Sequence, residues 1–131
     1  MIAVDTNVLV RFVVRDDARQ AARARRLFER LQSEGTQAYV TDIVLCELVW
    51  VLERSYRIER AEIAEVLARL IRARALTFDS TERIAGAIQS YMVGKGDFSD
   101  YLIREHATAR DCENVVTFDR QLLREAGFVA P

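Results

Sequence analysis

IAVDTNVLV, residues 2–10, is the stretch that decides the fold, because it places a short apolar segment directly before an aspartate. Ile2 to Asp5 is typical of a β-strand, and Asp5 stands where this strand ends. In sheets of parallel strands, ligands bind beyond the carboxyl ends of the strands. Asp5 therefore lies where such a fold places its functional groups. A turn aspartate that bonds its own backbone explains this segment equally well.

Outward from this stretch, strands alternate with helices along the whole chain. Apolar residues at helical spacing predict a helix near residues 18–34, ended by Gly35, and a helix at 42–55 that Thr41 caps. Since parallel strands need crossover connections, the alternation predicts an α/β fold with a parallel sheet in one domain, residues 1–131. The remaining helices are expected at 61–74, 81–93, 97–110 and 121–126, and the strands at 2–5, 38–40, 76–78, 114–117 and 128–130.

The composition is that of a globular chain with a substantial core. Half of its 131 residues are hydrophobic and 30% are charged. The chain can therefore bury a core that is stable without a structural metal ion or a disulfide. No apolar run is long enough to cross a bilayer, and the N-terminal stretch is typical of a core strand rather than of a secretion signal. Cys46 and Cys112 are expected to be buried free thiols in a reducing cytoplasm. With His106 as the single histidine, a Cys/His zinc site cannot be assembled.

Charge gives no general support for nucleic-acid binding, since the net charge is −1. Seven arginines nevertheless fall between Arg11 and Arg30, and guanidinium groups suit bidentate phosphate contacts. A solvated outer helix face explains this patch equally well.

Glu47 interrupts the run IVLCELVWVL, residues 43–52, which is otherwise wholly apolar. A helix of this composition is expected to be buried nearly all round. Its one acid is then expected to have a cation partner, either an arginine or a metal ion.

Three further aspartates occupy strand ends or helix starts. Asp97 and Asp100 stand three apart at the start of a predicted helix, so they share one helical face. Capping explains Asp97 well, but Asp100 lies nearly one turn in. Asp119 follows the strand at 114–117, where it is equally a turn or cap residue or a functional one.

Together, Asp5, Glu47, Asp100 and Asp119 map to strand ends or to the helices that follow them. Converging carboxylates repel one another unless cations neutralise them, and oxygen ligands of this type suit Mg²⁺ or Mn²⁺. Such ions typically assist displacement at a phosphodiester. The chain shows no evident serine–histidine or cysteine–histidine nucleophile pair and no glycine-rich phosphate loop, so carboxylate–metal hydrolysis is what remains.

The sequence resembles the PIN-domain ribonucleases, in particular the VapC-like toxins of toxin–antitoxin pairs. The resemblance covers almost the whole chain and rests on four motifs in the family's order: VDTNVL at 4–9, Glu47 within 43–48, DFSDYLI at 97–103 and VTFD at 116–119. It implies a three-layer α/β/α sandwich with a central parallel sheet of about five strands, and cleavage of RNA that depends on Mg²⁺ or Mn²⁺.

The resemblance also implies roles for individual residues. Asp5 and Asp100 correspond to the principal metal ligands, and Glu47 and Asp119 complete the cluster, with Glu47 either a ligand or a group acting on water. Asp97 is expected to cap the helix or to contact the metal ligands without binding the metal itself. Three further residues are expected to orient carboxylates or waters: Thr6, Asn7 and Thr117.

The resemblance also implies two protein partners: a second copy, forming a homodimer, and a cognate antitoxin that inserts a segment over the acidic pocket. The helix around Trp50 and the helix at 61–74 are candidate surfaces for them, although both patterns are also typical of core helices.

Two other functions compete with this one. A haloacid-dehalogenase-like phosphohydrolase needs an aspartate two residues after the first, where this chain has Asn7, and the single lysine, Lys95, lies in an unsuitable glycine-flanked loop. A non-catalytic PIN-fold binding module is disfavoured by the intact acidic set. The sequence leaves the target RNA open, because target choice depends on surface shape and loops.

Overall fold

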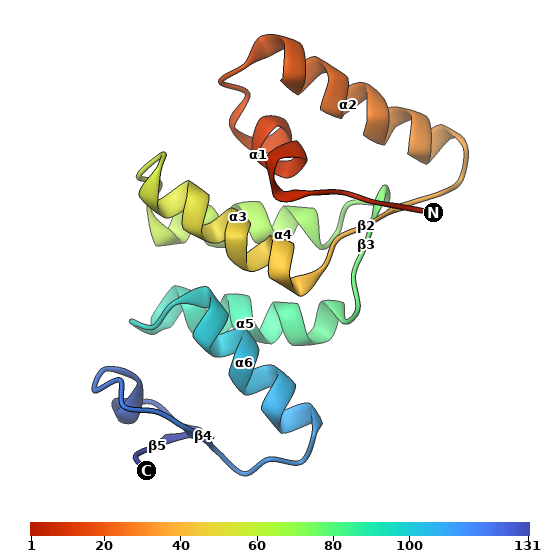
Figure 1. Cartoon of the computed structure of the whole chain (residues 1–131). Helices are drawn as coiled ribbons and strands as arrows, with labels where there is room; N and C mark the ends of the chain where they lie inside the picture. The colour runs from red at the N-terminus through yellow and green to blue at the C-terminus, as the bar shows by residue number, and fades with distance from the viewer. The chain divides into compact units, whose positions relative to one another are not determined.

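The computed structural model describes all residues, Met1–Pro131, and divides the chain into two compact units (Figure 1). The first unit is Met1–Asp79 and the second is Ser80–Pro131. Each unit is described by itself.

The first unit is built on a three-stranded parallel sheet. Strands β1 (Ile2–Ala3), β2 (Ala38–Tyr39) and β3 (Leu76–Thr77) lie in the order β1-β2-β3, with Ala38 paired to both Ile2 and Leu76. Because the strands are parallel, each connection must cross back over the sheet, and here helices fill the connections. The carboxyl end of β1 leads directly to Asp5, as the sequence predicts.

Four helices complete the first unit: α1 (Thr6–Val14), α2 (Ala18–Ser33), α3 (Asp42–Arg54) and α4 (Arg60–Leu70). Gly35, with a φ of 70°, follows α2, and the Thr41 hydroxyl accepts the Val44 N–H at the start of α3, both as expected. Helix α4 ends earlier than predicted. The chain tightens there through i to i−3 bonds, such as Ala73 N–H to Leu70 C=O, before entering β3.

Helix α1 is not among the helices that the periodicity predicts. Residues 8–14 are rich in β-branched and aromatic side chains, which favour strands in isolation. The helix forms because Asp5 caps it and because Leu9 and Val10 are buried. Tertiary packing thus overrides local propensity at this segment.

The second unit pairs two helices with a small sheet. Helices α5 (Thr81–Val93) and α6 (Phe98–Ala109) pack on each other, with the rings of Tyr91 and Phe98 edge to face at 6.0 Å. Strands β4 (Val115–Val116) and β5 (Phe128–Val129) pair in parallel. The helix expected at 121–126 is a short 3₁₀ helix, η1 (Leu122–Arg124).

The α/β fold class is confirmed. All five expected strands form, as a three-stranded and a two-stranded sheet, and every pairing is parallel. That residues 1–131 act as one domain stays a prediction. No helix in the structure combines the length and the apolar character needed to span a membrane.

The expectation for the two thiols is half wrong. Cys46 is half-buried in α3, and burial raises its pKa to about 11. Cys112 is exposed, because α6 ends before it and the chain turns through Asp111, whose φ is 60°. Both cysteines are free.

Candidate active site

Asp5 occupies the N-cap of α1, immediately after β1. One carboxylate oxygen accepts the Thr6 N–H at 2.7 Å, and the residue is otherwise exposed. The capping role and a ligand role are compatible, because a carboxylate has a second oxygen and further lone pairs. The start of α1 also favours negative charge at this position through the helix dipole.

Thr6 connects Asp5 to Glu47. Thr6 is buried, at 7% exposure, and its hydroxyl donates to Glu47 Oε2 at 3.3 Å. This bond joins the start of α1 to the middle of α3, across 41 residues of sequence. Thr6 thus contacts both Asp5 and Glu47, and its supporting role stays a prediction.

Glu47 itself is exposed, and the prediction of a buried acid is wrong. The inner face of α3 is formed by Leu45, Leu48, Val49 and Leu52. Glu47 lies on the opposite face with Ile43, which is 71% exposed, and Trp50, which is 44% exposed. The apolar residues of α3 occupy all sides of the helix, so the sequence pattern does not predict which side faces the core and which side is exposed. Glu47 forms no ion pair with an arginine.

Asn7 is exposed on α1, and its side chain makes no hydrogen bond, so its expected supporting role has no partner in this structure. It lines a groove between α1 and α2.

In the second unit, Asp97 and Asp100 form the start of α6. Asp97 occupies the N-cap position, as predicted, and Asp100 Oδ2 accepts the Asp97 backbone N–H at 2.9 Å. Partial burial raises the pKa of the Asp100 carboxyl above its usual range, against the opposing effect of this hydrogen bond. The carboxylates of Asp97, Asp119 and Glu125 raise the Asp100 pKa further. Asp100 is thus a partly buried acid surrounded by like charge.

Asp119 follows β4 on an exposed turn. Its Oδ1 accepts the Gln121 N–H at 2.9 Å and the Leu122 N–H at 3.4 Å, while the Thr117 hydroxyl accepts the Asp119 N–H at 3.0 Å. Thr117 therefore holds the backbone of Asp119, which fits the supporting role expected of it.

Glu125 is the acidic neighbour of Asp100 that the sequence analysis missed. Both of its carboxylate oxygens accept the Tyr101 hydroxyl at 2.8 Å. Glu125 lies outside the four motifs, at the end of a 3₁₀ turn, so no spacing signal identifies it.

Gly94 and Gly96 allow this arrangement. The Gly96 N–H donates to the Tyr101 hydroxyl at 2.9 Å, and a Cβ at Gly94 would collide with that same oxygen. Only glycine permits this close approach. The contact anchors Tyr101, the residue after Asp100, and so fixes the start of α6.

The predicted site residues fall into two groups. Asp5, Thr6 and Glu47 are linked in the first unit, and Asp100 and Asp119 influence each other electrostatically in the second. Within neither unit do three or more His, Cys, Asp or Glu side chains stand close enough to hold a metal ion. The donor chemistry fits a hard divalent cation, because the predicted ligands are all carboxylates and those around Asp100 repel one another.

Two comparisons relate the chain to known proteins. The family model described as PIN domain matches residues 2–128. The chain is 30% identical over 128 residues to a protein named VapC ribonuclease from Aquifex aeolicus (strain VF5). That alignment covers 98% of this chain and 93% of the relative.

Proposed function

Since the chain belongs to the PIN domain family, we propose that it is a divalent-metal-dependent endoribonuclease that hydrolyses RNA phosphodiester bonds. The observation that carries this proposal is the likeness to a VapC ribonuclease over nearly the full length of both chains. The family model matches residues 2–128, and the four acidic motifs lie within that range.

We assign Asp5 and Asp100 as principal ligands of Mg²⁺ or Mn²⁺, with Glu47 and Asp119 completing the set. The assignment rests on the order of the motifs in the sequence. It is supported by the exposed carboxylate of Asp5 after β1 and by the like charges around Asp100, which a cation would relieve.

When bound, the ion supplies charge neutralisation at the phosphate and lowers the pKa of water. The chain's own residues supply position. Thr6 fixes Glu47 through Oε2, so Oε1 of Glu47 is the atom we assign to take the proton from the attacking water. The water oxygen forms a new bond to phosphorus while a bond from phosphorus to a ribose oxygen breaks. That ribose oxygen takes a proton from solvent, and Glu47 returns its proton to solvent, so the step balances.

We further propose that the protein is the toxin of a toxin–antitoxin pair and acts as a cytoplasmic homodimer with a cognate antitoxin. The exposed apolar side chains of Ile43 and Trp50 on α3 support a protein partner, because large exposed apolar groups that lie together commonly mark interfaces.

RNA cleavage by the purified protein tests the proposed reaction. Cleavage is measured on structured and unstructured RNAs with Mg²⁺, with Mn²⁺ and with excess EDTA, in the absence of antitoxin. Asp5→Asn is expected to abolish cleavage. Asp111→Asn is the control, because Asp111 is exposed, lies outside the motifs and has a φ of 60° that asparagine tolerates.

Metal-dependent cleavage that Asp5→Asn removes and Asp111→Asn retains would support the proposal. Absence of cleavage on all RNAs would instead favour a non-catalytic binding module. Cleavage that persists in Asp5→Asn would contradict the assignment of the site.

A further inference from the structure

An open groove runs between α1 and α2 within the first unit. Its volume is about 1200 Å³, and four arginines line it: Arg11, Arg23, Arg26 and Arg30. Asn7, two residues after Asp5, is one of the residues that line the groove. The groove therefore reaches the first turn of α1, the helix that Asp5 caps.

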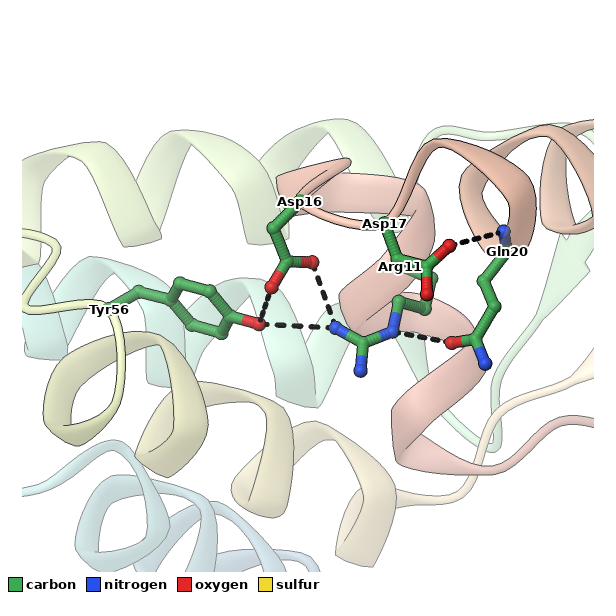
Figure 2. A network of polar contacts seen from close by, with 5 residues as sticks. All are labelled: Arg11, Asp16, Asp17, Gln20 and Tyr56. Atoms are coloured by element: carbon green, nitrogen blue, oxygen red, sulfur yellow. Dashed lines mark hydrogen bonds and ion pairs between the residues drawn. The ribbon is translucent and has the colours of Figure 1, made fainter.

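Arg11 has a structural role in this groove. Figure 2 shows its guanidinium bonded to three residues: Nη1 donates to Asp16 at 2.8 Å and to the Tyr56 hydroxyl at 3.3 Å, and Nε donates to Gln20 at 2.6 Å. Asp17 in turn accepts the Gln20 N–H at 3.0 Å. Asp16 offsets the charge of Arg11. Arg11 therefore holds the α1–α2 connection in place and is not available as an unpaired cation for a ligand.

Arg23, Arg26 and Arg30 differ from Arg11 because they are exposed and form no ion pair. Their spacing of three and four residues places them in one row on α2. Glu29 also lines the groove, but it pairs with Arg25 at 3.7 Å. The row is thus an uncompensated positive stripe, roughly 10 Å long at 1.5 Å per residue.

The rest of the lining indicates what kind of contact the groove can make. Val8, Ala24 and Leu27 supply apolar surface, and no aromatic side chain contributes. Stacking of bases, which commonly holds single strands, has no platform here. Guanidinium forks are suited to phosphate oxygens, and such contacts do not read sequence.

We propose that this groove binds the phosphate backbone of the RNA substrate and leads it toward Asp5. The inference rests on the proposed function for the identity of its occupant. The three arginines on α2 set affinity and its dependence on salt, and they contribute nothing to the choice of cleavage sequence.

Binding without cleavage tests the groove. The probe is a fluorescent 20-nucleotide oligouridine, measured by anisotropy in EDTA over a series of salt concentrations, with the RNA checked for integrity afterwards. The triple variant Arg23→Gln, Arg26→Gln, Arg30→Gln is expected to bind at least about tenfold more weakly at 0.1 M salt. The slope of log affinity against log salt is expected to fall by about 2, since three phosphate contacts are lost.

The matched control is Arg69→Gln, Arg72→Gln, Arg74→Gln, which removes the same charge from exposed positions that do not line the groove. It is expected to bind within about twofold of the wild type. Glutamine preserves helix propensity at the four substituted positions that lie in helices, Arg23, Arg26, Arg30 and Arg69, and equal thermal midpoints verify the folding of both variants. Equal losses in both variants, or no loss in the groove variant, would overturn the proposal.

An antitoxin segment is the competing occupant. A groove variant that keeps its RNA affinity but no longer copurifies with the cognate antitoxin would assign the groove to protein and overturn the proposal. The test is independent of the reaction. If the protein binds RNA through the groove but does not cut it, the proposed function alone is overturned. If the protein cuts RNA and the groove variant binds RNA as tightly as the wild type, the proposed role of the groove alone is overturned.

Discussion

Thr6 connects the two candidate-site acids of the first unit, because its N–H donates to Asp5 and its hydroxyl donates to Glu47. We expect Thr6→Val to lower RNA cleavage by about 10- to 100-fold, the usual cost of losing a group that orients a metal ligand. Stability should change little, because valine fills the same buried space and the exposed Glu47 can be hydrated. Cleavage rates and thermal midpoints of both proteins measure this. Thr6→Ser keeps the hydroxyl and should restore most of the activity, whereas equal activity of Thr6→Val and wild type would contradict this role of Thr6.

Asp100 is the residue for which pH dependence can be worked out. Its pKa in the folded chain is raised, so folding favours the neutral carboxyl, and the ionised form opposes folding as pH rises through the folded pKa. Asp100→Asn removes that charge and keeps an acceptor for the Asp97 N–H. Without metal, we expect the variant to have a higher urea midpoint than wild type at pH 7.

The gain of Asp100→Asn should shrink as pH falls toward the ordinary aspartate pKa of about 4, where the wild-type carboxyl is also neutral. Urea unfolding in EDTA at pH 4 and at pH 7 measures both midpoints. A gain that is equal at the two pH values would show that charge on Asp100 is not its cause.

At the scale of elements, the best-predicted parts are those whose ends carry a chemical signal. The helix at 18–33 ends before Gly35, and the helix at 42–54 begins after Thr41, both as the residue types indicate. Helix α1 could not be predicted in this way, because its β-branched residues favour a strand and its stability comes from Asp5 and from packing. The contrast separates what local chemistry specifies from what tertiary contacts specify.

The same contrast between local chemistry and tertiary contacts applies to the candidate site. Asp5, Asp100 and Asp119 were placed at strand ends or helix starts by sequence pattern, and the structure has them there. The exposure of Glu47 and the proximity of Glu125 to Asp100 depend on which helix faces pack, and no motif encodes that.

Helix α2, which presents the arginine row, depends on its N-cap. The Asp17 carboxylate accepts the Gln20 N–H, so Asp17→Ala should cost about 1 kcal/mol of unfolding free energy. Asp17→Asn keeps a capping acceptor without the charge and should lose much less. Urea unfolding measures all three proteins. An equal loss in the alanine and asparagine variants would mean that the charge of Asp17, and not its cap bond, stabilises the helix.

At the scale of the whole molecule, the two compact units raise the question of cooperativity. The PIN family match runs through both units, from residue 2 to residue 128. The second unit has about 50 residues and a sheet of two short strands, and so small a unit is only marginally stable by itself. We therefore expect the chain to unfold as one domain.

Differential scanning calorimetry of the full chain tests this expectation. A chain of this length that unfolds cooperatively should show one transition, with an enthalpy of about 90 kcal/mol per chain near 60 °C. Scans at several protein concentrations are needed, because a homodimer that dissociates on unfolding has a midpoint that rises with concentration. Two resolved transitions at every concentration would contradict a single domain. They would also imply that residues 80–131 gain their stability from a source other than the size of their own core.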